Sequence, residues 1–189
     1  MRRWYGWLAH VLTPVLASAP PIAVAAAGLD VVTPSTAFVQ AGMAESTSTL
    51  VFGMTWDWPW TFEFKAGAVS GYLEASLGRW RAKGEAGGSS SSAWVTQIGI
   101  TPVVRFQPDR SAWFAELGIG ANVLTPIYRS RDKRFSTAFN FGDHIAVGRA
   151  FGASRQHEIS VRFQHFSNAG IRRPNPGEDF VQIRYARAF

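Results

Sequence analysis

The chain of 189 residues contains no cysteine. Disulfide bonds and thiolate metal sites are therefore excluded, while the cellular compartment stays open. Charged side chains are also scarce, at 17% of residues, although soluble domains usually carry more. No stretch beyond residue 30 is apolar enough to cross a membrane as a helix. The length fits one domain. The absence of long apolar stretches after residue 30 argues against a helical membrane bundle.

Aromatic residues and positive charge are what the chain has in excess. Aromatic side chains make up 14% of residues, including 8 Trp and 14 Phe, and the formal net charge is +6. A positive charge favours anionic partners such as nucleic acid, anionic lipid or lipopolysaccharide. Charge alone does not separate these partners.

The N-terminal segment predicts a cleaved signal peptide covering residues 1–27. Arg2 and Arg3 form a basic start, a mostly apolar stretch follows, and small residues end it. A transmembrane helix is the alternative, but the prolines within the segment disfavour a regular spanning helix. Cleavage is expected after Ala25 or Ala27, which leaves residues 28–189 as a single domain.

The rest of the chain repeatedly alternates apolar with small or polar residues, as strands with two different faces do. In one segment Trp113, Leu117 and Ile119 share a face that opposes Glu116 and Gly118. Turn-like stretches such as "DWPW", "QPDRS" and "NAGIRRPNPG" separate the segments. The expected strands cover residues 35–45, 48–58, 69–82, 92–107, 111–125, 135–151, 155–168 and 179–189.

Two architectures fit about eight such strands. A soluble sandwich or lipocalin-like barrel would bury the apolar face, whereas a membrane barrel turns it toward lipid. The polar faces combine Gly, Ala and Ser with charges such as Glu74, Arg105 and Arg162, which suits a narrow barrel interior. We therefore predict an all-β fold, an eight-stranded antiparallel transmembrane β-barrel of the outer-membrane type. Asp143 breaks the pattern, because it shares the apolar face unless a bulge turns it inward.

The motif "HFSNAG" places His165 and Ser167 at the end of an expected strand, on its apolar face. In an even-stranded outer-membrane barrel with periplasmic termini, this end is extracellular. Asp179 begins the last strand with the same parity as Val181. A serine, a histidine and an acid on one wall suit hydrolysis of a lipid ester. The alternative is an interfacial histidine followed by an ordinary turn.

Several segments resemble the PagL family, the lipid A 3-O-deacylases of Gram-negative outer membranes. They are "HFSNAG", "PNPGEDFVQIRYARAF", "LVFGMTWDWPW", "GYLEASLGRW", "FAELGIGANV" and "FNFGDHIAVGRAFG". The resemblance implies an eight-stranded barrel in the outer membrane whose active site faces the outer leaflet. It also implies hydrolysis of the ester-linked 3-hydroxyacyl chain at the 3 position of lipid A, without a cofactor or metal.

The resemblance assigns roles to residues by matched position. His165 is the expected general base and Ser167 the nucleophile, followed by Asn168 at the family's activity-critical asparagine. The oxyanion and positioning residues are Asn175 and Gly170. The family's acidic position falls on Asp179, where the family has Glu, and Glu178 is the alternate acid.

Basic residues in the expected extracellular segments are candidates for binding lipid A phosphates. They are Arg129, Arg131, Lys133, Arg134, Arg172 and Arg173. The expected partners are lipopolysaccharide and the outer membrane, with a possible homodimer and no nucleic acid. Two other functions stay open: a structural or adhesive small barrel, and a lipid A acyltransferase, which would need its active groups in an interior pocket.

Overall fold

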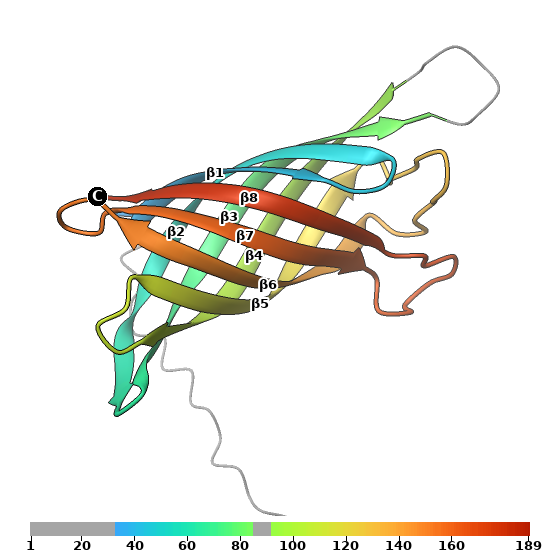
Figure 1. The fold of residues 1–189 in the computed structure, drawn as a ribbon. Helices are drawn as coiled ribbons and strands as arrows, with labels where there is room; N and C mark the ends of the chain where they lie inside the picture. The colour runs from blue at the N-terminus through green and yellow to red at the C-terminus, as the bar shows by residue number, and fades with distance from the viewer. Residues whose placement is uncertain (1–32, 85–91) are drawn as a thin grey trace, which may run out of the picture.

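The computed structural model describes residues 33–84 and 92–189 as a closed antiparallel barrel of eight strands (Figure 1). This confirms the predicted fold, whereas the predicted signal peptide, residues 1–27, lies outside the described residues. The described residues include no helix long and apolar enough to cross a membrane. The strands are β1 (Thr36–Met43), β2 (Thr47–Phe64), β3 (Gly67–Lys83), β4 (Ser92–Pro108), β5 (Trp113–Thr125), β6 (Phe139–Phe151), β7 (His157–Ser167) and β8 (Glu178–Ala188).

Each strand pairs with its sequence neighbours, and β1 pairs with β8 to close the barrel. Closure gives every strand a paired neighbour on each side, so the barrel has no edge strand. The two faces divide as the alternation predicts: on β4, Ile98 is 56% exposed and its neighbour Gln97 is 4% exposed. The wall is apolar outside and polar inside, which is the arrangement of a barrel surrounded by lipid.

β2 continues through "DWPW", so the prediction of a turn there was wrong. Pairing with β1 stops at Thr55, and the register with β3 shifts between Asp57 and Thr61. Pro59 lies inside this irregularity, where a residue without an N–H is tolerated in a strand. The resulting long β2–β3 hairpin projects beyond the other turns at the end of the barrel that holds the C-terminus (Figure 1).

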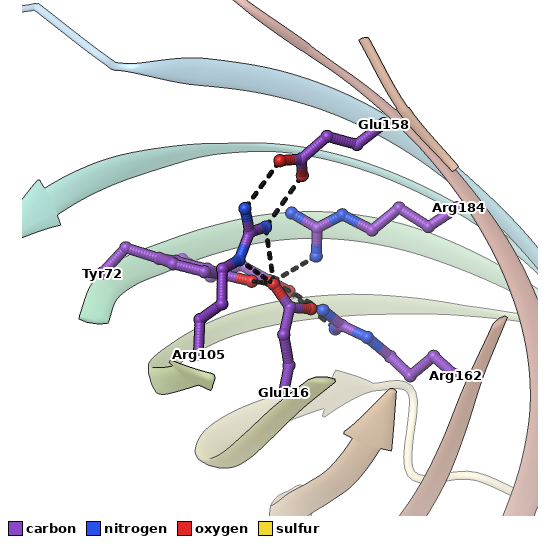
Figure 2. A network of polar contacts seen from close by, with 7 residues as sticks. Tyr72, Arg105, Glu116, Glu158, Arg162 and Arg184 are labelled. Carbon is purple, nitrogen blue, oxygen red and sulfur yellow. Dashed lines mark hydrogen bonds and ion pairs between the residues drawn. The ribbon is translucent and has the colours of Figure 1, made fainter. Parts of the chain in front are cut away.

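Paired charges fill the barrel interior. Glu74 accepts hydrogen bonds from Arg162, at 3.1 and 3.2 Å, and from Arg184, at 2.5 Å. Arg105 lies between Glu116 and Glu158 and bonds both carboxylates (Figure 2). Buried charges are tolerated only when they are paired in this way. The interior is therefore a packed ionic core that joins five of the strands.

Five aromatic side chains close the barrel at the end opposite the C-terminus. We call them the mouth cluster: Trp80, Tyr128, Phe135, Phe166 and Phe180, each at most 2% exposed. The rings of Phe166 and Phe180 both lie 4.8 Å from the Trp80 ring. Tyr128 and Phe135 belong to the β5–β6 loop, residues 126–138, which lies at the same end as the β7–β8 loop (Figure 1).

Candidate active site

His165 and Asp179 face each other on neighbouring strands. They are direct partners in the β7–β8 register, and His165 Nδ1 lies 2.6 Å from Asp179 Oδ1. Both side chains are on the outer wall, 41% and 52% exposed. Because Nδ1 is engaged with a carboxylate, Nε2 is the ring nitrogen left for proton transfer. The pair has the base-and-acid arrangement that nucleophilic ester hydrolysis requires.

Ser167 follows on the same face of β7. Two residues along a strand separate its Cα from that of His165 by about 6.6 Å. The Ser167 hydroxyl makes no hydrogen bond with any residue in 33–84 or 92–189. Hydrogen bonds between a nucleophile and its base are often long before substrate binds. The structure thus brings Ser167 beside the His165–Asp179 pair with its hydroxyl uncommitted.

Glu178, the alternate acid, lies on the opposite face of β8 from Asp179. Its side chain is 1% exposed inside the barrel mouth. It accepts hydrogen bonds from Tyr128 Oη and from Lys133 Nζ, the latter at 3.1 Å. Burial raises the pKa of the Tyr128 hydroxyl above its ordinary value, so the phenol stays protonated and donates to Glu178. The structure does not bring Glu178 to His165.

The two predicted asparagines bond one another across the turn after β7. Asn168 N–H donates to Asn175 Oδ1 at 3.0 Å, which leaves Asn175 Nδ2 as an uncommitted donor among the described residues. Gly170 N–H donates to Asn168 Oδ1 at 3.0 Å. The Gly170 amide is therefore engaged within the loop, whereas Asn175 keeps a donor free for a ligand.

Gly177 is a site residue that sequence reasoning missed. Its backbone has φ +69 and is buried directly against the His165 ring. A methyl group added at Gly177 would lie 2.5 Å from His165 Cε1, so only glycine leaves room for the ring. The only sequence signal was the dipeptide Pro176–Gly177, which reads as an ordinary turn.

An apolar groove of about 810 Å³ runs along the outer wall from His165. It crosses β4 to β7 and is lined by Pro102, Val104, Leu117, Gly118, Ile119, Asp143, His144, Ile145, Phe163 and His165.

Asp143 contributes a carboxylate to this groove. The β5–β6 and β6–β7 registers run through Asp143 without a bulge, so it stays on the outer face, directly opposite His165. Its Oδ1 is buried and has no hydrogen-bond partner among the described residues. The half-buried Asp143 side chain makes no hydrogen bond or ion pair with any described residue, which leaves its carboxylate for a ligand in the groove.

The predicted basic residues divide into two groups. Arg129, Arg131, Arg172 and Arg173 are exposed on the β5–β6 and β7–β8 loops, and so is Arg134, which forms a β-bridge with Arg129. Lys133, by contrast, turns inward to its ion pair with Glu178. It is therefore committed to the barrel mouth, and the prediction that it is a phosphate ligand does not fit this geometry. The described residues contain no cluster of His, Asp and Glu that could hold a metal ion.

Comparison with known families agrees with this site. Residues 49–188 match the family described as "Lipid A 3-O-deacylase (PagL)". This chain belongs to the PagL family. As a PagL-family member it is an ester-hydrolysing enzyme of the outer membrane, which confirms the resemblance seen in the sequence.

Individual PagL relatives support the assignment. The lipid A deacylase PagL of Bordetella bronchiseptica is 42% identical over 104 residues, which cover 55% of this chain and 56% of that protein. Its counterpart in Pseudomonas aeruginosa is 30% identical over 142 residues, which cover 75% of this chain and 78% of the relative. A crystal structure of the outer membrane enzyme PagL superimposes with a TM-score of 0.70 at 25% identity, covering 82% of this chain and all of that one.

Proposed function

We propose that this chain removes the ester-linked 3-hydroxyacyl group from the 3 position of lipid A in the outer leaflet. The observation that carries the proposal is the placement of Ser167, His165 and Asp179 together on the outer wall, beside an apolar groove. A substrate lying in the leaflet reaches such a site along the wall of the barrel, without leaving the membrane.

In the first half of the reaction, Ser167 Oγ attacks the ester carbonyl and its proton passes to His165 Nε2. Asp179 accepts the Nδ1–H bond, which fixes the ring tautomer and stabilises the imidazolium. The tetrahedral intermediate places a negative charge on the former carbonyl oxygen. Asn175 Nδ2 is the uncommitted donor next to the nucleophile and suits the stabilisation of that charge.

Collapse of the intermediate breaks the ester bond, and the sugar hydroxyl leaves with the proton from His165. A water molecule then attacks the acyl-enzyme while His165 takes its proton. The second collapse releases the hydroxy fatty acid and returns the proton to Ser167 Oγ. Apart from this one water molecule, the steps use side chains of this chain, and the proton that Ser167 Oγ gives up in the first half is replaced in the second.

The groove and the exposed loops account for binding of the two ends of the substrate. The apolar lining next to His165 suits the acyl chain, and the unpartnered carboxylate of Asp143, which lines the groove, can accept a hydrogen bond from its 3-hydroxyl group. Arg129, Arg131, Arg172 and Arg173 supply guanidinium donors for the phosphates at the membrane surface. Guanidinium groups pair with phosphate through two parallel hydrogen bonds, so these four exposed arginines suit this role.

Single substitutions in the proposed triad test the function. Ser167→Ala removes the nucleophile and His165→Ala removes the base, so each is expected to abolish release of the 3-hydroxy acid while the barrel still folds. Mass spectrometry of lipid A from cells that express each variant measures the deacylation. Ser154→Ala, in the turn at the opposite end of the barrel, is the matched control and is expected to deacylate normally. Normal deacylation by either triad variant would refute the assignment.

The same experiment separates the remaining candidates. A structural or adhesive barrel leaves lipid A unchanged, and an acyltransferase changes the acyl count of a second lipid instead of releasing free hydroxy acid. The interior pocket that an acyltransferase needs is occupied here by the ion pairs of the lumen. A homodimer and the absence of nucleic-acid binding stay predictions, which light scattering and a gel-shift assay test.

A further inference from the structure

The side chains on the inner face of the barrel behind the triad are almost completely buried. Phe166 lies between His165 and Ser167 in β7 and is 1% exposed. Glu178 and Phe180 flank Asp179 in β8 and are 1% and 0% exposed. Because neighbours in a strand point to opposite faces, every outward triad residue is backed by a buried inward neighbour.

The β5–β6 loop forms hydrogen bonds and an ion pair with Glu178, the first residue of β8. Tyr128 Oη donates to the carboxylate of Glu178, and Thr47 bonds the same phenol oxygen at 2.6 Å. Lys133 Nζ adds an ion pair to Glu178 at 3.1 Å. The residue that these bonds fix is joined by one peptide bond to Asp179. Displacement of the backbone at the beginning of β8, which carries Asp179, therefore strains these buried bonds.

The same loop is hydrogen-bonded to Asn168, the first residue of the turn that follows Ser167. Asn168 Nδ2 donates to Ser136 Oγ at 3.1 Å, to Thr137 Oγ1 at 3.2 Å and to Arg172 O at 2.8 Å. Ser136 Oγ donates a hydrogen bond to Arg172 O at 2.8 Å, and Thr137 Oγ1 donates to Phe139 O at 2.7 Å. Each hydroxyl thus accepts one bond from Asn168 and donates one to a carbonyl.

These bonds redefine the role of Asn168. Its N–H, its Nδ2 and its Oδ1 are all engaged within the protein, and its side chain is 1% exposed. Such a group has no donor left for substrate. It connects the β5–β6 loop to the turn that follows Ser167 and holds Asn175.

We infer that the β5–β6 loop positions the catalytic groups, with Tyr128, Ser136 and Thr137 as positioning residues that act through Glu178 and Asn168. The inference rests on the proposed triad. The loop forms hydrogen bonds with two residues whose side chains are buried: Asn168, which follows Ser167, and Glu178, which precedes Asp179. It fixes their spacing before substrate arrives, although none of its described hydrogen bonds goes to Ser167, His165 or Asp179.

Removal of the two hydroxyls tests the inference. The double variant Ser136→Ala/Thr137→Val is expected to lower kcat by about tenfold to a hundredfold, the cost of a small misplacement of catalytic groups. KM should change much less than kcat, because the groove is intact and the Arg172 bond that is lost involves its backbone carbonyl and not its guanidinium. A fluorophosphonate reagent, which labels activated serines, should react with Ser167 more slowly by the same factor. Restoring one hydroxyl, as Ser136→Ala/Thr137→Ser, should recover most of the rate.

Tyr128→Phe independently tests the hydrogen bond between the loop and Glu178. The ring keeps its place in the mouth cluster, and only the hydroxyl that bonds Glu178 is lost. It is expected to lower kcat and the labelling rate without changing KM. Heat-dependent gel mobility checks that each barrel is folded, and if the double variant does not fold, Tyr128→Phe decides the question. Ser154→Ala is the control for loss of a hydroxyl at the opposite end.

The outcomes separate this inference from the proposed triad. A folded double variant or Tyr128→Phe with wild-type kcat and labelling would overturn the positioning role and leave the triad intact. A raised KM with unchanged kcat would also overturn it, since the hydroxyls would then serve substrate binding. If Ser167→Ala still deacylates lipid A, the triad itself fails.

Discussion

Asp179 and Glu178 are consecutive carboxylates with opposite surroundings. Asp179 is half exposed on the outer wall and bonds His165, whereas Glu178 is buried and bonds Tyr128 and Lys133. The difference follows from the two-residue period of a strand, which turns neighbours to opposite faces. At the scale of single residues, this alternation places Asp179, and not Glu178, on the same wall as His165.

Neutralising each carboxylate distinguishes the two roles. Asp179→Asn removes the charge that stabilises the imidazolium, and kcat is expected to fall by about 10³–10⁴-fold. Glu178→Gln keeps an oxygen that accepts the Tyr128 hydrogen bond, so a much smaller loss is expected. Steady-state hydrolysis of purified lipid A measures both. If Glu178→Gln proved the more damaging change, the strand register around residues 178–180 would be wrong.

At the scale of elements, β7 shows how a strand serves two environments. Phe163 is 47% exposed on the outer wall and lines the groove, whereas Gln164 and Arg162 are 5% and 1% exposed inside. This is the division that the alternation of the sequence predicts. The continuous registers with β6 and β8 keep that division through to Ser167. The outward face of β7 therefore joins the groove to the catalytic pair.

Spin labels at two neighbouring positions test this division of β7. A nitroxide at Phe163 should be relaxed strongly by oxygen, which concentrates in the bilayer, and weakly by a water-soluble reagent. A label at Gln164 should be protected from oxygen by the barrel wall. In addition, Phe163→Arg should impair insertion, because a lipid-facing charge costs about 2–4 kcal/mol near the midplane and less toward the interface. Reversed accessibilities would mean that β7 is inverted.

At the scale of the whole molecule, the ionic core joins distant strands. Glu74 on β3 meets Arg162 on β7 and Arg184 on β8, and all three side chains are nearly inaccessible (Figure 2 shows the two arginines). Desolvated charges are tolerable only while each has its partner. The network therefore makes the closed barrel cooperative, and it lies inside the barrel, whereas the catalytic pair lies on the outer wall.

Glu74→Gln tests the contribution of this network. It removes the charged carboxylate that both buried arginines bond directly, so the free energy of unfolding should fall by about 3–5 kcal/mol. Urea titration followed by tryptophan fluorescence in detergent micelles measures the change. The control is Glu63→Gln at the exposed tip of the β2–β3 hairpin, which should be neutral. Folded Glu74→Gln should keep its deacylase rate, and unchanged stability would refute a structural role for the ion pairs.

The sequence by itself determined the barrel, the facing of its strands and the shared wall of His165, Ser167 and Asp179. Alternation is a local property, and the side chains that face lipid differ sharply from those that fill a narrow lumen. The same pattern left Asp143 unexplained, and only the unbroken strand register placed it in the groove.

Only the tertiary structure decided how the β5–β6 loop is used. Loop residues have no periodicity, so nothing in the sequence told the inward Lys133 from the exposed Arg131. The contacts that set its role join residues far apart, as Tyr128 does with Thr47 and Glu178. Such contacts form only once the barrel has closed and brought β2, β8 and the loop together at one mouth. They depend on the burial of polar groups there and not on local propensity.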